Sequence, residues 1–408
     1  MIVKLSLFNK IITTCLQIAL IPLSFFLIIF FGCGVKCSDP MKIIAKQTNI
    51  ETERLSPTQM KEDLDYLIQV IISSHPDMNF FKSEKDFAKK KTNCYKKLDR
   101  DLSLEEFFNI VNPVVNALGD DHTMIYPPKG KCPKQQYHYA KEIYQDIKGR
   151  ETISNNTYII INEKKICILR FNTCGSPNEY HLYKDFFKKI FTEINEQKID
   201  TLIVDIRNNQ GGYSGNSSEL LRYITDTPFR QYENATRKIS QESLAFYENC
   251  DINLLVLLKK DFDTSSLKVS DSGELMPGTF ITEAKYLYPV DENLRFKGKT
   301  YILIGPNVFS SGMLFANTAQ YYKIAPLVGK KTRWKFSKQH VGDVIIGTLP
   351  HSNLYFMVST TVFIVSKLSG KSSTHIVPDY NVSRLKFSAS KNRDAILEYA
   401  IKLAGKTL

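Results

Sequence analysis

The segment DTLIVDIRNNQGGYSGN, residues 200–216, joins a short apolar run to a pair of glycines and the start of a helical pattern. The run that ends at Ile206 is typical of a strand buried on both faces of a sheet. NSSELLRYITD, residues 216–226, has the pattern of the helix that follows. Gly211 and Gly212 allow the backbone to turn sharply between the two elements. The segment therefore predicts a parallel strand, a tight turn and a helix.

The same alternation of strand and helix continues on both sides of this segment. KKICILRF (164–171), KTYILIG (299–305) and APLVGK (325–330) have strand patterns. NEYHLYKDFFKKIFTEINEQ (178–197) and SSGMLFANTAQYYK (310–323) have helical patterns. Strands and helices alternating at this length indicate parallel βαβ units and hence an α/β fold. Residues 229–297 are expected to be an insertion with some strand content.

The preceding part of the chain has helical patterns. Ser56 and Pro57 stand at the N-cap and first positions of an amphipathic segment that stops near His75 and Pro76. Two further helical segments follow, at 83–101 and 103–118, the second with a capping box formed by Ser103 and Glu106. We therefore expect a helical N-terminal domain at residues 56–128 and an α/β catalytic domain at 129–408.

The first 33 residues have a different character. Lys4 and Lys10 precede a mostly apolar stretch, Ile11–Gly32, as in a secretory signal. Gly32 before Cys33 resembles a bacterial lipoprotein signal with an atypical, phenylalanine-rich box, which makes Cys33 the expected lipidation site. An uncleaved anchor and a cleaved, soluble product are the alternatives, and all three are exported. Residues 34–55 are expected to be a tether, so the remainder would lie in the cell envelope next to the membrane.

Composition narrows the class of protein. The formal net charge is +12, but the lysines are interspersed with acidic residues, whereas nucleic-acid binders concentrate them in a stripe. We expect no nucleic-acid partner. None of the eight cysteines forms a CxxC pair, and no metal site or cofactor is expected. In an exported protein, some of the last five cysteines can form disulfide bonds; these are Cys94, Cys132, Cys167, Cys174 and Cys250.

Two adjacent serines, Ser310 and Ser311, stand where a buried strand's C-terminal loop meets a helix start. Functional sites gather at the carboxyl ends of strands in open α/β sheets. The unpaired N–H groups of a helix start stabilise a developing anion, so a serine here suits the role of nucleophile. The alternative interpretation is that one of the serines only caps the helix.

A serine nucleophile needs a base, and two candidates stand out. His122 is flanked by Asp120 and Asp121 in LGDDHT (118–123), and a carboxylate could orient its ring. The alternative interpretation is that His122 only belongs to a surface loop. Lys335, in VGKKTRWKF (328–336), is the second candidate, because a desolvated lysine can also serve a serine.

Three separated patterns, LGDDHT (118–123), LIVDIRNNQGG (202–212) and YILIGPNVFSSGMLFA (301–316), resemble those of the S41 serine peptidases, which include C-terminal processing peptidases and the tricorn core. PLVGKKT (326–332) and HIVPDY (375–380) extend the resemblance. It implies a ClpP/crotonase-like α/β core after a helical N-terminal unit. It also implies a peptidase that acts on peptide or protein substrates.

By the same resemblance, Ser310 is the nucleophile, and the oxyanion donors are the Ser311 N–H and that of Gly211 or Gly212. His122 matches the base of the tricorn-like branch. Lys335, 25 residues after Ser310, matches the base of the Ser–Lys branch. We favour His122, because Trp334 stands where a glycine usually precedes that lysine.

The chain also departs from the family pattern. The tricorn-like branch orients its histidine with a glutamate just before the Pro-Asp pair, and SKLSGKSSTHIVPD (366–379) has none. The orienting acid is then Asp121, another residue, or missing. About 38 residues between Pro128 and Ile166 are too few for a PDZ domain. The missing glutamate motivates a competing hypothesis, a catalytically silent peptide- or glycan-binding lipoprotein; an esterase is a further one.

Overall fold

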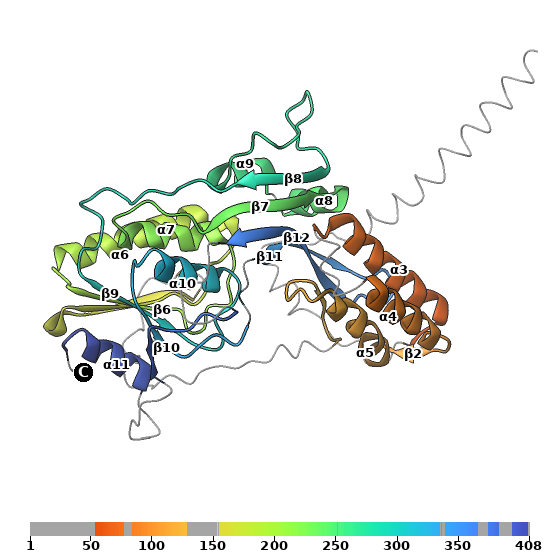
Figure 1. Ribbon diagram of the computed structural model, residues 1–408, viewed down its shortest axis with the longest axis horizontal. Coiled ribbons are helices and arrows are strands. Elements are labelled where there is room, and N and C mark those ends of the chain that lie inside the picture. The colour runs from red at the N-terminus through yellow and green to blue at the C-terminus, as the bar shows by residue number, and fades with distance from the viewer. Residues whose placement is uncertain are drawn as a thin grey trace, which may run out of the picture.

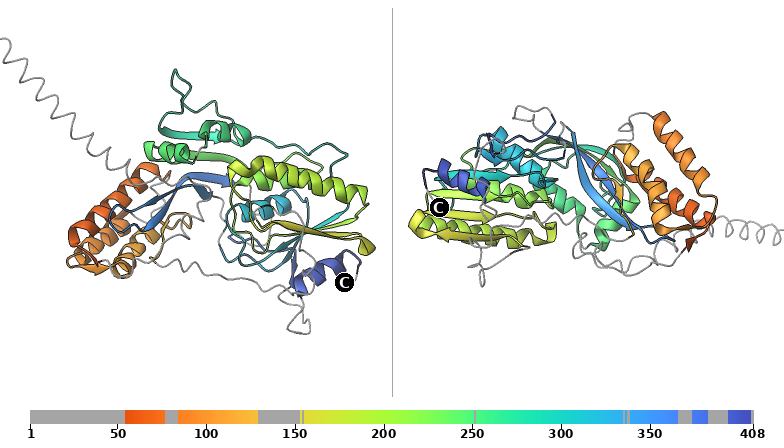
Figure 2. Two further views of the ribbon diagram at one scale, coloured as in Figure 1. Left: turned by 180° about the vertical axis from the view of Figure 1, so that it is seen from behind. Right: turned by 90° about the horizontal axis from the view of Figure 1, so that it is seen from below.

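The computed structural model describes residues 54–76, 84–128, 155–250, 252–334, 339–365, 374–382 and 394–406, together with Ile153 and Phe336. The expected signal, Cys33 and most of the tether lie outside this part of the chain. Figures 1 and 2 show a helical unit at one end of the molecule and a helix-covered sheet at the other. A second sheet joins them.

The larger sheet has the strand order β13-β10-β9-β6-β5-β4. Its members are β4 (Thr157–Ile161), β5 (Ile166–Arg170), β6 (Thr201–Asp205), β9 (Lys299–Ile304), β10 (Leu327–Gly329) and β13 (Tyr380–Asn381). All neighbouring pairs are parallel except β4 and β5. The expected α/β fold built from parallel βαβ units is therefore confirmed.

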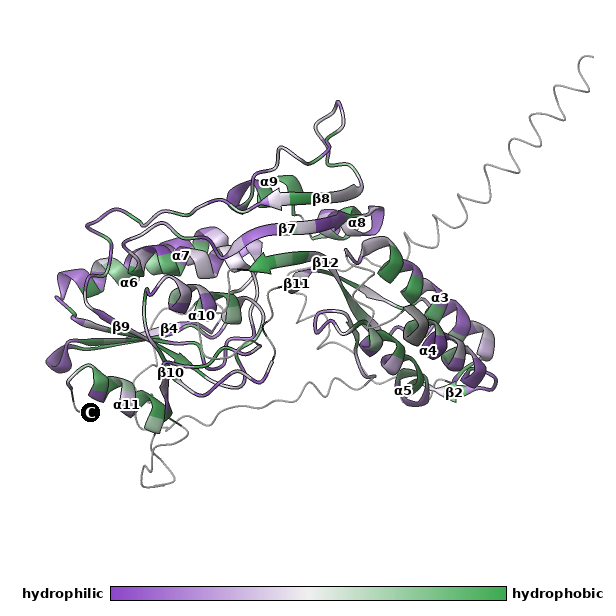
Figure 3. Ribbon diagram, in the orientation of Figure 1, coloured by the Kyte–Doolittle hydropathy of each residue, from purple (hydrophilic) through white to green (hydrophobic). Residues whose placement is uncertain are grey.

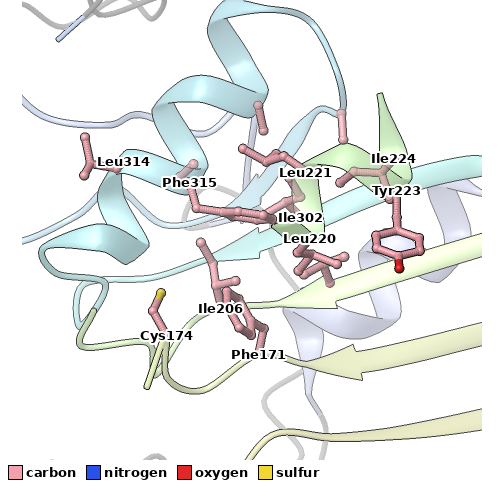
Figure 4. Packing of buried hydrophobic residues seen from close by; sticks show 14 of the residues in the cluster. Phe171, Cys174, Ile206, Leu220, Leu221, Tyr223, Ile224, Ile302, Leu314 and Phe315 are labelled. Carbon is pink, nitrogen blue, oxygen red and sulfur yellow. The ribbon is translucent and has the colours of Figure 1, made fainter. Parts of the chain in front are cut away.

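Helices cover both faces of this sheet. On one face lie α6 (Tyr180–Glu196), α7 (Ser214–Ile224) and α10 (Ser311–Tyr321), and on the other lies α11 (Ala395–Leu403). Leu202 and Val204 of β6 join the first core, whereas Ile203 joins the second. Successive side chains of a strand point to opposite faces, which explains why the three central residues of β6 are all apolar. Figure 4 shows the first core, where Phe315 of α10 packs near Leu220 and Leu221 of α7.

The second sheet is antiparallel, with the order β11-β12-β7-β8 and β3 (Met124–Ile125) paired to β12. Its other strands are β7 (Tyr232–Ile239), β8 (Gly278–Glu283), β11 (Gln339–Thr348) and β12 (Tyr355–Val365). Helices α8 (Gln241–Asn249) and α9 (Leu254–Asp261) lie between β7 and β8 in the chain. Residues 229–297, expected as an insertion, thus supply two strands of a sheet that the sequence did not predict.

The helical unit consists of α3 (Pro57–Ser74), α4 (Glu84–Lys97) and α5 (Leu104–Val115), which the 3₁₀ turn η2 (Asn116–Leu118) follows. A two-residue ladder pairs β1 (Arg54–Leu55), which precedes α3, with β2 (Leu102–Ser103), which precedes α5. Ser56 and Ser103 each form a capping box. The apolar side chains of this unit share one core with those of β11 and β12, and Figure 3 shows the apolar character of α5 and β12. The second sheet therefore attaches the helices to the rest of the chain.

Four cysteines in the described residues, Cys94, Cys167, Cys174 and Cys250, are buried. No disulfide bond joins any two of these four. In the described part of the chain, no helix is both long and apolar enough to cross a membrane.

Candidate active site

Ser310 lies in the loop between β9 and α10, with backbone angles φ 47° and ψ −126°. A positive φ is unfavourable for a residue with a Cβ, at a cost of about 1–3 kcal/mol. The surrounding backbone holds this conformation: Phe309 N–H donates to the Asn209 carbonyl at 3.0 Å, and Met313 N–H donates to the Ser310 carbonyl at 2.8 Å. The Ser310 side chain forms no capping hydrogen bond to α10. Its hydroxyl is thus turned away from the helix it precedes.

The partner of this hydroxyl is His122, from the turn after η2. Its Nε2 lies 3.1 Å from Ser310 Oγ across 188 positions of the chain. The His122 ring is buried and stacks on Phe309, with 4.8 Å between the ring centroids and 17° between the ring planes. The structure therefore brings together the serine and the histidine that the sequence singled out, and packing fixes the ring of the histidine.

Asp120, rather than Asp121, is the buried carboxylate beside this ring. Its Oδ1 lies 3.9 Å from His122 Nδ1 and accepts the backbone N–H of His122 at 2.8 Å. Asp121 is exposed. The sequence proposed Asp121 as the orienting acid, but two adjacent residues in a tight turn point in different directions, and here the first of them points inward.

Polar groups from the same turn, from β12 and from the end of α3 hold the Asp120 carboxylate. Its Oδ2 accepts hydrogen bonds from Thr123 Oγ1 and Ser359 Oγ, both at 2.6 Å, and lies 3.4 Å from His75 Nε2 at the end of α3. Burial alone would raise the pKa of Asp120, but the side chains of His75, Ser359 and Thr123 and the charge of His122 lower it below its ordinary value. Asp120 therefore remains ionised at neutral pH.

The pKa of His122 is lowered from its ordinary value. Burial is the largest cause, and the negative charges of Asp120, Asp121 and Asp343 oppose it. A histidine with a lowered pKa is neutral at pH 7 and can accept a proton on Nε2. The site thus contains a neutral imidazole beside a hydroxyl and an ionised carboxylate.

The glycine pair lies directly against Ser310. Gly211 and Gly212 have φ of +99° and +122°, and a Cβ added to Gly211 would lie 2.6 Å from Ser310 Cβ and 3.0 Å from Ser311 N. Only glycine can adopt this backbone and leave room for the serine. The β6 and β9 strands are parallel neighbours, so the loops that follow them meet at the same edge of the sheet.

The N–H groups around Ser310 differ in their partners. Gly211 N–H donates to Asn209 Oδ1 at 2.8 Å. Within the described part of the chain, the N–H groups of Gly212 and Ser311 donate to no other group. The Gly211 carbonyl accepts from Cys174 N–H at 2.8 Å, and in a trans peptide the next N–H points the opposite way. Gly212 N–H is therefore directed away from Cys174, and it is a better candidate for an oxyanion donor than Gly211 N–H.

Comparisons with known proteins identify the family. A model of peptidase family S41 matches residues 165–382, more than half of the chain. The chain belongs to peptidase family S41. A comparison with curated proteins gives no significant match.

Two solved structures show the fold of this S41 peptidase family member. A candidate peptidase from Parabacteroides merdae is 15% identical, with a TM-score of 0.55, over 86% of this chain and 97% of that one. Mature CPAF is 12% identical, with a TM-score of 0.51, over 85% of this chain and 97% of that one. The ClpP/crotonase-like α/β core that the resemblance implied is thereby confirmed. At these identities, the similarity concerns the fold alone.

Sequence reasoning missed part of this candidate site. It interpreted His75 as a helix stop and gave no role to Asn209 or Ser359. The signal for Ser359 was present, since Ser359, Thr360 and Thr361 form a polar run within the apolar strand β12. Lys335 lies outside the described residues, and its position as a second base stays a prediction.

Proposed function

We propose that this chain is an exported, membrane-tethered serine peptidase that hydrolyses peptide bonds through an acyl-enzyme. The observation that carries the proposal is the 3.1 Å separation of Ser310 Oγ and His122 Nε2, with Ser310 in a strained backbone conformation. Strain of this kind persists only where the surroundings enforce it, and it concentrates at functional sites. Membership of family S41 supports a peptide or protein as substrate.

The first half of the reaction forms the acyl-enzyme. Ser310 Oγ attacks the carbonyl carbon of the scissile bond while His122 Nε2 takes the hydroxyl proton. The carbonyl electron pair moves to its oxygen, and the N–H groups of Gly212 and Ser311 stabilise the resulting oxyanion. The tetrahedral intermediate then collapses, the C–N bond breaks, and His122 gives its proton to the departing amine.

The second half releases the acid product. Water attacks the ester carbonyl, and His122 Nε2 takes one of its protons. The C–O bond to Ser310 breaks, and the same proton returns to Ser310 Oγ. In both halves His122 is transiently an imidazolium, and the ionised carboxylate of Asp120 stabilises this charge from the Nδ1 side. We therefore propose Asp120 as the orienting acid of a Ser310–His122–Asp120 triad.

The location of the enzyme is the second part of the proposal. Lys4, the apolar stretch Ile11–Gly32 and Cys33 support a lipoprotein signal, with Cys33 lipidated and residues 34–55 as a tether to the membrane. The helical domain at 56–128 and the catalytic domain at 129–408 would then lie in the cell envelope. The mass of the mature N-terminus tests this part: a diacylglyceryl-modified Cys33 supports it, and an intact Met1 contradicts it.

A fluorophosphonate probe tests the catalytic part, because it reacts covalently only with an activated serine. We expect the wild-type protein to label and Ser310→Ala not to label. Ser272→Ala, which removes an exposed hydroxyl from a turn, is the matched control and should label normally. An unlabelled but folded wild-type protein would instead support the silent binding protein. Comparing His122→Ala with Lys335→Ala then identifies the base: loss of hydrolysis only in the lysine variant would overturn the assignment of His122.

A further inference from the structure

One aromatic surface beside the candidate nucleophile has no part in the reaction above. Trp334, the only tryptophan of the chain, is 37% exposed and lies against Phe309, with 5.2 Å between the ring centroids and 56° between the planes. Phe309 directly precedes Ser310 and stacks on His122. The three rings therefore form a continuous series from the base to a partly exposed tryptophan.

The backbone fixes the position of this tryptophan. Thr332 N–H donates to the Ile376 carbonyl at 3.1 Å, and Phe336 N–H donates to the Thr374 carbonyl at 2.6 Å. Thr332 and Phe336 are fully buried, so the chain is anchored on both sides of Trp334 while its side chain stays outside the core. Arg333 N–H also donates to the Pro306 carbonyl at 3.2 Å, which ties this segment to the loop that carries Ser310.

We propose that Trp334 and Phe309 form a substrate subsite that binds an apolar or aromatic side chain next to the scissile bond. The proposal rests on the peptidase function assigned to Ser310. A peptide carbonyl within reach of Ser310 Oγ brings its flanking side chains over the rings that adjoin Ser310 and His122. Burying an aromatic or large aliphatic side chain on such rings is favourable, and no rearrangement is needed because the rings are already in place.

The charges near the rings select among possible side chains. An aromatic face can also bind a cation. Carboxylates act on His122, at the other end of the ring series. The segment that carries Trp334, however, exposes Lys330, Lys331 and Arg333, and their charges would repel a lysine or arginine bound at Trp334. A neutral apolar side chain incurs no such penalty. The subsite is therefore expected to prefer phenylalanine or leucine to alanine and to basic residues.

The experiment compares peptides that differ in one residue flanking the cleaved bond, as phenylalanine, alanine or lysine, on each side in turn. We expect kcat/KM for the best phenylalanine peptide to exceed that for alanine by about 10- to 200-fold. Trp334→Ala should reduce this ratio to about threefold or less while still cleaving the alanine peptide, and Trp334→Phe should retain most of it. Tyr288→Ala is the matched control, since it removes an exposed aromatic side chain beside the C-terminal end of α7.

Fluorescence separates failure of the subsite from failure of the peptidase proposal. Trp334 is the only tryptophan, so its emission in Ser310→Ala reports binding of the phenylalanine peptide without cleavage. If the emission shifts on titration with the peptide but the wild-type protein does not hydrolyse it, the peptidase proposal is refuted and the binding surface is supported. Hydrolysis with the same phenylalanine-to-alanine ratio in wild type and Trp334→Ala would refute the subsite alone. A preference for lysine that Trp334→Ala removes would refute its apolar specificity.

Discussion

The Ser311 hydroxyl donates a 2.6 Å hydrogen bond to the carbonyl oxygen of Gly212. This bond connects the loop after β9 to the loop after β6, 99 positions earlier in the chain. The two residues also carry the N–H groups that we assign to the oxyanion hole. The side chain of one donor residue thus holds the carbonyl of the other donor residue, one peptide unit after the Gly212 N–H.

The first prediction concerns this bond. Ser311→Ala keeps the Ser311 N–H but removes the hydroxyl that holds Gly212. A hydrogen bond of this kind contributes about 1 kcal/mol, so we expect a modest loss of stability. We expect a larger effect on catalysis, a decrease in kcat of about tenfold or more, because oxyanion donors act only in precise positions. Steady-state kinetics and urea unfolding measure the two effects.

Ser266→Ala is the control for this prediction. Ser266 Oγ also donates to a carbonyl, that of Ile281, at 2.6 Å, but in the exposed part of the stretch between α9 and β8. Its loss should leave kcat unchanged. Equal decreases in kcat in the two variants would show that the Ser311 hydroxyl has no specific role.

The second prediction concerns the space at Gly211. In Gly211→Ala the new methyl group would lie 2.6 Å from Ser310 Cβ, at a φ of +99° that alanine rarely adopts. The serine loop must then move, and displacements of about 1 Å can reduce the rate about 100-fold. We expect at least this loss of kcat/KM together with a lower free energy of unfolding.

Gly273→Ala separates backbone strain from displacement of the serine. Gly273 has a φ of +82°, and nothing lies within 4 Å of an added Cβ. This variant should lose about 1 kcal/mol of stability and no activity. If Gly211→Ala retained full activity, the close contact of the two loops would have no catalytic importance.

The third prediction is a pH dependence. His122 must be neutral to accept a proton, so kcat/KM falls as the pH drops through the pKa of His122. Because burial lowers this pKa, we expect the acid limb to lie below about pH 6.5, the ordinary value for histidine. Asp120→Asn removes a negative charge that raises the pKa, so the limb should move to still lower pH. The plateau rate should also fall, by about 100-fold or more, since the imidazolium loses its counterion.

Asp121→Asn is the matched control for the pH profile. Asp121 also raises the pKa of His122 through its charge, but it is exposed. We expect a small shift of the acid limb in the same direction and an unchanged plateau. If Asp121→Asn lowered the plateau rate and Asp120→Asn did not, Asp121 would be the orienting acid after all.

The sequence predicted features that depend on local patterns. The α/β core follows from continuous apolar strands that alternate with amphipathic helices, and Ser310 and His122 stood out because of the glycines, serines and acids near them. The second sheet was not predicted, because β7 pairs with β12, more than a hundred positions later in the chain. Local sequence patterns could not decide between Asp120 and Asp121 as the orienting acid either. The choice depends on Ser359 and His75, which reach Asp120 from β12 and from the end of α3.

The last prediction concerns Arg207, the residue that follows Ile206 in the segment 200–216. Its guanidinium lies 2.7 Å from Asp205 Oδ2 and 2.6 Å from Asp394 Oδ2, and Arg207 and Asp205 are buried while the Asp394 side chain is 9% exposed. Asp394 also caps α11. Asp394→Ala should cost about 3 kcal/mol, because it leaves a buried charge without one of its two counterions and removes a helix cap. Chemical denaturation at pH 7 measures this loss.

The same pair predicts how stability depends on pH. Burial raises the pKa of Asp394, but hydrogen bonds and the charge of Arg207 lower it more, so the folded value lies below the ordinary one. The unfolded protein then binds a proton first, and the contribution of Asp394 is complete above about pH 4 and is lost as the pH falls through the folded pKa. Asp394→Asn should remove this part of the acid sensitivity.

Asp226→Asn is the control. It breaks the exposed pair with Arg295 and should change neither stability nor its pH dependence appreciably. If Asp394→Asn and Asp226→Asn lost the same free energy of unfolding at pH 7, burial would not make the Arg207–Asp394 pair more stabilising than an exposed pair.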